Sequence, residues 1–140
     1  MSRTAQEIFQ SYVHAGPLTR DADALAATFT EDGVFEAPLL PDGAALPRRI
    51  EGREAIRATM AAYYRQQGSD GRVPNVRKSG FVLHTTADPD VFIAEIDTIF
   101  DREGEEGGED DLVVSLVQIF RVRDGRIARL RDYFSPTLVD

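Results

Sequence analysis

Hydrophobic residues in the first part of the chain are spaced as on a helix. Thr4 and Glu7 form a capping-box pattern, in which the hydroxyl and the carboxylate satisfy free amide donors of the first turn. The apolar residues that follow fall on one helical face: Ala5, Ile8, Phe9, Tyr12 and Val13. The pattern predicts one amphipathic helix that ends at Gly16 and Pro17.

Two more helices are expected before residue 70. The first begins near Asp21 or Asp23, and its buried stripe is Leu25, Ala26 and Phe29. Glu31-Asp32-Gly33 then has turn composition, a short strand covers 34–37, and Pro38 ends it. A loop covers 39–49, and a third helix after Gly52 has an apolar face of Ile56, Met60, Tyr63 and Tyr64.

From residue 76 onward the period changes to that of strands. Strands are predicted over 76–86, 91–100, 112–123 and 127–134. Asp124-Gly125 separates the last two, and it is the pair that a type I′ hairpin turn favours because both residues need positive φ. Helices first and antiparallel hairpins later predict an α+β fold over residues 1–140, a single domain with its N-terminal helices over a curved antiparallel sheet and one small-molecule pocket.

Net charge and composition exclude several classes of partner. The formal charge of −8 disfavours nucleic acid and anionic membrane surfaces, and the absence of cysteine excludes disulfides and thiolate chemistry. The first residues lack the apolar run of a signal peptide, and no apolar stretch is long enough to span a bilayer, so a cytoplasmic location is expected. The acidic segment 101–111 contributes −6 of the charge and departs from the calcium-loop pattern, which favours a solvated hairpin tip.

Sequence motifs of the common catalytic kinds are missing. The chain has no G-x-S-x-G elbow, no phosphate-binding glycine loop and no H-x-x-x-H pair. His14 and His84 belong to different elements, so neither a metal site nor a cofactor is expected. Each histidine fits a helix-end or strand-surface position better than a general base.

Carboxylates on strands are the remaining candidates for chemistry. Asp132 shares a strand face with Leu130 and Phe134, so burial should raise its pKa toward the range useful for proton transfer. Glu95 and Asp97 share a face of their own strand, which opens either to the pocket, to water or to a second subunit.

Substrate-binding candidates lie on several elements. Glu36 stands on the first predicted strand, and Phe134 is a neighbour of Asp132 in the last. Tyr12 and Tyr64 belong to apolar helix faces, which favours core packing, although a phenol that reaches a pocket can donate a hydrogen bond to a substrate oxygen.

The order of segments resembles the nuclear-transport-factor-two-like superfamily, and within it the SnoaL-like group, which includes polyketide cyclases. The residues that carry the resemblance are F-x-E-D-G-V-F-E from Phe29, G-R-E-A-I from Gly52 and the final R-D-Y-F-S-P from Arg131. The resemblance implies a cone, in which a bent sheet wraps a long helix, and a homodimer formed through the sheet.

The resemblance also distinguishes between activities. Ketosteroid isomerases carry a general base where this chain has Ala37 and an oxyanion-binding acid near Ser115, so that reaction is not expected. Limonene epoxide hydrolases match at Asp97 and Asp132 but carry an arginine where this chain has Glu95. Phenazine-biosynthesis members carry an acid in the final strand where Asp132 stands, and SnoaL-type cyclases use a carboxylate as the acid–base group in an otherwise apolar pocket.

These comparisons predict a cofactor-free enzyme of secondary metabolism with Asp132 as general acid and base. The expected reaction is cyclisation or isomerisation of a hydrophobic, carbonyl-bearing metabolite, with Glu95 and Asp97 tuning Asp132 or binding a polar substituent. Two alternatives stay open: water activation by Asp97 and Asp132, as in an epoxide hydrolase, and a pocket that binds a ligand without turnover.

Overall fold

A computed structural model describes residues 4–67, 74–100 and 112–136. The acidic segment 101–111 therefore lies outside the described residues. The helices are α1 (Ala5–Val13), the π-helical turn η1 (His14–Leu18), α2 (Ala22–Ala27) and α3 (Arg53–Gln67). The strands are β1 (Phe29–Glu36), β2 (Arg49–Glu51), β3 (Gly80–Thr85), β4 (Val91–Phe100), β5 (Leu112–Arg123) and β6 (Arg126–Tyr133).

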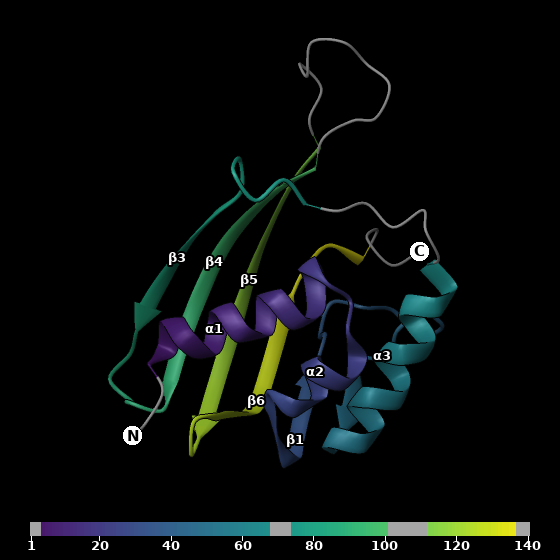
Figure 1. The fold of residues 1–140 in the computed structure, drawn as a ribbon, viewed down its shortest axis with the longest axis horizontal. Coiled ribbons are helices and arrows are strands. Elements are labelled where there is room, and N and C mark those ends of the chain that lie inside the picture. The colour runs from purple at the N-terminus through teal and green to yellow at the C-terminus, as the bar shows by residue number, and fades with distance from the viewer. Residues whose placement is uncertain (1–3, 68–73, 101–111, 137–140) are drawn as a thin grey trace.

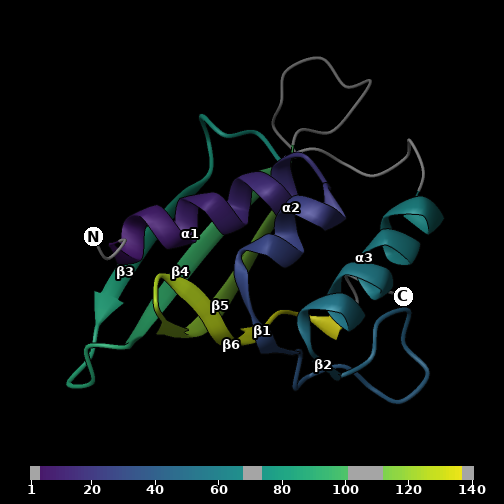
Figure 2. The same ribbon diagram turned by 60° about the horizontal axis from the view of Figure 1, so that its bottom comes forward.

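The strands form one sheet in the order β2-β1-β6-β5-β4-β3. Every neighbouring pair is antiparallel except β1 and β6, which run parallel, so the sheet is mixed rather than purely antiparallel as predicted. All three α-helices lie on one face: α1 crosses the middle strands, and α3 lies beside β1 and β2 (Figures 1 and 2). The predicted α+β class and the helix-covered sheet are thus confirmed.

Local sequence signals explain where the elements begin and turn. The capping box is formed, since the Thr4 hydroxyl accepts from the Glu7 amide and the Glu7 carboxylate accepts from the Thr4 amide. Asp21 caps α2 by accepting from the Ala24 amide. In the β5–β6 hairpin, Asp124 and Gly125 have φ values of 53° and 78°, as a type I′ turn requires.

The end of the first helical segment and the start of the first strand differ from the prediction. Coiling continues past Gly16 and Pro17 because η1 closes with a wide turn, in which the Thr19 amide donates to the His14 carbonyl at 3.1 Å. Strand β1 begins already at Phe29, so the predicted turn at 31–33 lies inside a strand. Pairing with β6 changes register between Phe29 and Val34, which absorbs these turn-forming residues as an irregularity.

Aromatic side chains join α1 to the inner face of the sheet. Phe120 on β5 is fully buried, stacks on Phe92 at 4.7 Å between ring centroids, and meets Phe9 and Tyr12 of α1 edge-on at 5.9 and 5.7 Å. Edge-on and offset-stacked rings are the arrangements that the ring quadrupole favours. Phe120 therefore holds α1 and two strands in one cluster.

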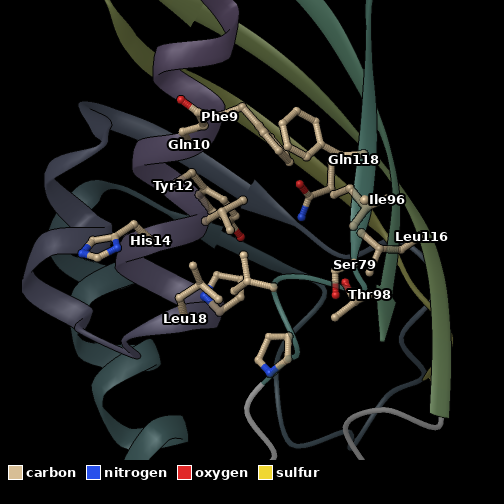
Figure 3. Close-up of a pocket in the computed structure, with 16 residues that line it drawn as sticks. Phe9, Gln10, Tyr12, His14, Leu18, Ser79, Ile96, Thr98, Leu116 and Gln118 are labelled. Carbon is tan, nitrogen blue, oxygen red and sulfur yellow. The ribbon is translucent and has the colours of Figure 1, made fainter. Parts of the chain in front are cut away.

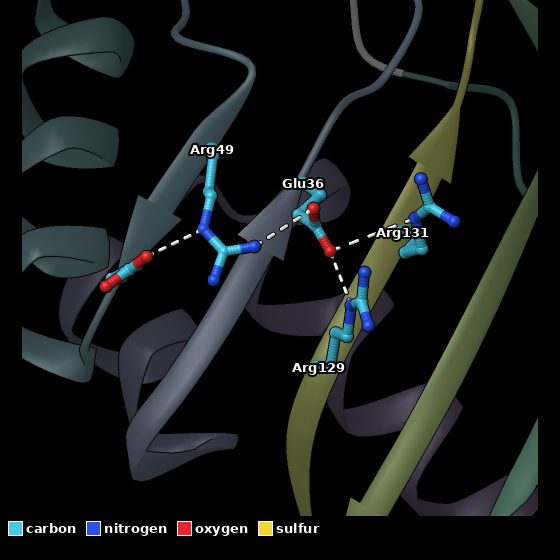
Figure 4. Close-up of polar contacts among 5 residues, drawn as sticks. Glu36, Arg49, Arg129 and Arg131 are labelled. Atoms are coloured by element: carbon cyan, nitrogen blue, oxygen red, sulfur yellow. Dashed lines mark hydrogen bonds and ion pairs between the residues drawn. The ribbon is translucent and has the colours of Figure 1, made fainter.

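The outer face of the sheet carries charge. Glu36 accepts hydrogen bonds from Arg129 and from Arg49, the latter at 3.2 Å, and Arg131 lies 3.8 Å away (Figure 4). Burial would raise the pKa of Glu36, but the hydrogen bond from Arg129 and the three positive charges outweigh it and lower that pKa. Glu36 is thus an ionised structural partner of arginines on the face away from the helices.

We expect Phe120→Ala to lower the free energy of unfolding by about 3–5 kcal/mol, because it removes a buried ring and leaves a cavity between α1 and the sheet. Urea unfolding followed by circular dichroism measures the loss. Phe120→Leu is the matched control and should cost clearly less, since most of the buried volume stays filled. A loss below about 1 kcal/mol for Phe120→Ala would show that α1 does not depend on this ring.

Candidate functional site

A cavity of about 430 Å³ lies between α1 and the inner face of β3, β4 and β5 (Figure 3). Its strand wall is a cross-strand row of Phe81, Ile96 and Leu116, with Thr98 and Gln118 beside it. Its helix wall comes from α1 and η1, and the segment that leads into β3 completes the lining: Phe9, Gln10, Tyr12, Val13, His14, Pro17, Leu18, Pro74, Val76 and Ser79. The lining is mostly apolar, and the volume suits a small organic ligand.

The π-helical turn shapes one end of this cavity. In η1 the backbone closes a wider turn than an α-helix does, and this places Pro17 and Leu18 on the lining. Had the chain left the helix at Gly16, as the sequence suggested, these two side chains would not complete the wall. The prediction missed this feature because no sequence signal distinguishes a π turn from a helix end.

Asp132 is buried beside the cavity, with 8% of its surface exposed. Strand alternation places it on the inner face with Leu130 and Phe134, as predicted. Burial raises its pKa to about 7, and a hydrogen bond from Gln118 opposes that rise only in part. At neutral pH both the acid and the carboxylate forms are therefore populated.

Gln118 separates Asp132 from the cavity. It pairs with Asp132 across β5 and β6, and its Nε2 donates to Asp132 Oδ2 at 3.1 Å. Gln118 lines the cavity whereas Asp132 does not. Sequence reasoning did not single out Gln118, although a glutamine on the most apolar strand at the position facing Asp132 was an available signal.

Two buried oxygens of this pair have no hydrogen-bond partner among the described residues: Oε1 of Gln118 and Oδ1 of Asp132. Buried polar atoms are normally paired, because an unpaired one loses its hydration without compensation. Two such atoms on neighbouring side chains at the edge of an apolar cavity therefore indicate a place for a polar group of a ligand.

Tyr12 brings a hydroxyl donor to the same region. Figure 3 shows the Tyr12 side chain and the Gln118 amide pointing toward each other across the space between α1 and β5. Burial, together with the nearby charges of Asp132 and Tyr64, raises the pKa of Tyr12 well above its usual value. The phenol therefore stays protonated and can donate a hydrogen bond.

Tyr64 and Phe134 are close to the site without lining the cavity. The hydroxyl of Tyr64 lies near Gly16, 3.5 Å from where a Cβ on that glycine would stand, and burial raises the pKa of Tyr64 to about 12. Phe134 is buried in the hydrophobic core. Neither residue is part of the cavity lining in this structure.

The other predicted carboxylates face away from the cavity. Glu95 and Asp97 alternate with the inward-facing Ala94, Ile96 and Thr98, so they lie on the outer face of β4. There Glu95 contacts His84, and Asp97 accepts a hydrogen bond from Ser115 at 2.6 Å. Glu36 is also on the outer face, among its arginines.

This placement does not fit three of the predicted roles. Asp97 and Asp132 are on opposite faces of the sheet, so they cannot hold one water between them, and the epoxide-hydrolase arrangement is not formed. Glu95 and Asp97 cannot contact a ligand that Asp132 contacts, and Glu36 cannot bind a substrate in this cavity. The alternation of side chains along a strand predicted which residues share a face. Both faces of β4 carry apolar residues, however, so alternation alone could not predict which face the helices cover.

The described residues offer neither a metal cluster nor a membrane span. No group of three or more His, Asp or Glu side chains in this part of the chain is arranged to hold a metal ion. None of the described helices has the length and apolar character needed to cross a bilayer. A second hollow of about 460 Å³ lies in the loop over residues 41–49, where its charged groups Asp42 and Arg48 pair with each other.

Comparison with known proteins gives a consistent family. The SnoaL-like domain profile matches residues 9–130. The uncharacterized protein YesE of Bacillus subtilis is 34% identical over 125 residues, which is 87% of this chain and 76% of YesE. An uncharacterized PhzA/B-like protein of Pseudomonas aeruginosa, PA3332, is 33% identical over 129 residues, 89% of this chain and 81% of that protein.

Solved structures show the same fold. A Bacillus subtilis protein described as a candidate isomerase has a TM-score of 0.70 at 27% identity, over 96% of this chain and 88% of its own. A protein of Catenulispora acidiphila with a ketosteroid-isomerase-like fold, solved with trimethylamine, has a TM-score of 0.62 at 21% identity, over 98% and 91% of the two chains.

We expect Asp132→Asn to stabilise the protein, and more so at high pH. A pKa raised by folding means that the native state binds the proton more tightly than the unfolded chain, so stability falls as pH rises from about 4 to 7 and is level above. Replacing the carboxyl removes that loss, so the stabilisation should be about 2–3 kcal/mol larger at pH 8 than at pH 5.

Urea unfolding at the two pH values measures the difference. Asp97→Asn is the matched control, because Asp97 lies on the outer face and is hydrogen-bonded to Ser115, and it should not show this gain. If Asp132→Asn and Asp97→Asn shift stability equally at both pH values, Asp132 is not a desolvated acid.

Proposed function

The chain belongs to the SnoaL-like domain family, and we propose that it is a cofactor-free enzyme that transfers protons on a hydrophobic, carbonyl-bearing small molecule. The observation that carries this proposal is Asp132, a buried carboxyl group with a pKa of about 7 and one unpaired oxygen beside an apolar cavity. A general base works best when its pKa lies near the working pH, and desolvation is the means by which proteins bring a carboxylate there.

The proposed step begins with ionised Asp132. Its carboxylate takes a proton from the carbon next to the ligand's carbonyl. The C–H electron pair forms a carbon–carbon double bond, and the π pair of the carbonyl moves to its oxygen to give an enolate. The Tyr12 hydroxyl donates a hydrogen bond to that oxygen as its charge develops. Where the enolate is conjugated with a double bond, protonated Asp132 then returns the proton to the far carbon of the dienolate, which moves the double bond and isomerises the molecule. Alternatively the enolate carbon attacks a second carbonyl, which closes a ring, and Asp132 gives its proton to the alkoxide oxygen that forms.

Direct transfer requires Asp132 to meet the ligand. Because Gln118 stands between Asp132 and the cavity, its side chain must swing away from Asp132 Oδ2 as the ligand enters. A ligand that releases this hydrogen bond also leaves Asp132 without its stabilising donor, so the carboxylate becomes a stronger base. Entry of a ligand into the cavity would therefore make Asp132 a stronger base.

Ligand binding without turnover is the second candidate. It is favoured by one observation: Asp132 does not line the cavity in the structure described. The trimethylamine held by the Catenulispora relative shows that a protein of this fold can be solved with a small organic guest. In this case Asp132 would serve only to hold Gln118.

Exchange of carbon-bound protons separates the two functions. We expect the protein to accelerate deuterium incorporation next to the carbonyl of 2-tetralone, an apolar bicyclic ketone, in D₂O, as followed by proton NMR. Asp132→Asn should reduce the enzymatic rate by at least about 100-fold, since it removes the base. With 2-tetralone saturating at each pH, the rate should rise with pH around 7, because Asp132 must be ionised.

Asp97→Asn should exchange protons at the wild-type rate. Exchange by Asp132→Asn at the wild-type rate would refute the role of Asp132. If 2-tetralone binds but no variant, nor the wild type, accelerates exchange, the protein is a ligand-binding module.

Two copies are proposed to associate through the outer face of the sheet. Val82, Val113 and Val117 are exposed there, at 57%, 56% and 38%, and Glu95 pairs in register with both Val82 and Val117. Exposed valines that share one sheet face are typical of an interface rather than of a solvated surface.

We expect light scattering after gel filtration to give the mass of a dimer for the wild type and of a monomer for Val117→Lys, because a buried lysine charge opposes association. Leu39→Lys is the control, since Leu39 is also an exposed apolar residue, at 52%, but lies in the loop after β1. A monomeric wild type, or a dimeric Val117→Lys, would contradict this interface.

A further inference from the structure

Gln118 holds the position from which the cavity can select a ligand's polar group. It is 4% exposed, it lines the cavity, and one end of its amide is bound to Asp132 while the other end, Oε1, has no partner among the described residues. An amide has a donor end and an acceptor end of nearly the same shape, so reversing it exchanges the two without changing the packing.

The protonation state of Asp132 determines which end of the Gln118 amide can hydrogen-bond to it. An ionised Asp132 can only accept hydrogen bonds, so the Gln118 NH₂ group must point to it and Oε1 is left for the ligand, as in the structure. A protonated Asp132 carries a hydroxyl donor, and the Gln118 oxygen can then turn to accept from it. That reversal presents the NH₂ group to the ligand.

We propose that Gln118 is the specificity-determining residue of this cavity and that it converts the protonation state of Asp132 into a choice of ligand. With Asp132 ionised, the cavity offers a carbonyl oxygen and binds ligands that donate, such as alcohols and enols. With Asp132 protonated, it offers N–H groups and binds ligands that only accept, such as ketones. The inference uses the cavity of the proposed function and describes the first complex, in which Gln118 is still bonded to Asp132, and it does not depend on turnover. The proposed proton transfer begins only after Gln118 has swung away and Asp132 is ionised, so ketone binding and proton abstraction have opposite pH dependences.

The surroundings of the pair leave Asp132 as the group that changes. On β4 the cross-strand neighbour of Gln118 is Ala94, which has no polar side-chain atom. On β1 the charged Glu36 lies on the outer face. From α1 the facing titratable group is Tyr12, near Tyr64 of α3, and the pKa values of both phenols are raised, so both stay protonated.

His14 is the remaining titratable group on the cavity lining, and it is exposed. It needs a control of its own. His14→Asn removes the imidazole while it keeps a polar side chain at the end of α1, and the pattern expected below should persist in this variant.

Matched ligands test the inference. 2-Tetralone and 2-tetralol share one ring skeleton, and neither titrates between pH 5 and 9; the ketone only accepts hydrogen bonds, whereas the alcohol both donates and accepts. Isothermal titration calorimetry at pH 5.5 and 8.5 should show that 2-tetralone binds about tenfold more tightly at the lower pH, the effect of one gained hydrogen bond. 2-Tetralol should change by less than about threefold, because it can satisfy either end of the amide.

Two variants isolate the residue. Gln118→Met keeps the volume but neither end of the amide, so the pH dependence of 2-tetralone binding should disappear while circular dichroism stays native. Asp132→Asn, which does not titrate, should also remove it. Equal pH profiles for the ketone and the alcohol, or an unchanged profile in Gln118→Met, would overturn the inference.

These results are distinguishable from those of the exchange assay. If the protein does not accelerate proton exchange but the ketone and the alcohol still differ in the pH dependence of their affinity, the proposed enzyme is refuted and the role of Gln118 in ligand choice is supported. If exchange depends on Asp132 but the two ligands have the same pH dependence of affinity, the proposed enzyme is supported and the role of Gln118 in ligand choice is refuted.

Discussion

The packing of α1 across the inner face of the sheet is the constraint on which the rest of the structure depends. Phe120 anchors it by meeting a ring from the helix on one side and a ring from β4 on the other. Phe9 and Tyr12 are fixed at one end of the space between α1 and the sheet, so α1 cannot also fill the space over the strands beyond them. The cavity is the space left between α1 and the strands β3, β4 and β5. Its position therefore follows from the packing of the aromatic cluster.

The same packing gives Asp132 its chemistry. A carboxyl group under a helix loses its water, and the one hydrogen bond from Gln118 replaces only part of that hydration. A protein under selection for stability alone has no use for such a group, since an apolar residue of similar size would fit the neighbourhood of Leu130 and Phe134. The cost in stability is the physical reason to regard Asp132, rather than the well-paired Glu36, as functional.

Much of the fold was predictable because its signals are local. Alternation gave the bounds of β4 and β5, and Asp124-Gly125 gave the hairpin after β5. Strand β1 was cut short because turn-forming residues normally end a strand, whereas here the register irregularity against β6 accommodates them, a pairing between distant segments that no local window contains.

The site was half predictable for the same reason. Asp132 stood out since an acid between two apolar neighbours is unusual on any strand. Its partner Gln118 is ordinary in its own strand and becomes important only across the β5–β6 pairing. Glu95 and Asp97 share a face with each other, and only the placement of α1 shows that this face is the uncovered one.

Because of the wide turn η1, different elements of the site bear on the length of a ligand and on its functional group. Pro17 and Leu18 belong to the wall at the helix end, whereas Tyr12 belongs to α1 and Gln118 to β5. In the proposed function, the length of that last turn sets how long a ligand can be, and Gln118 on β5 sets which functional group it must carry. If the proposed function holds, adding or removing a residue after α1 changes the size of the ligand that fits and leaves Asp132 and Gln118 in place.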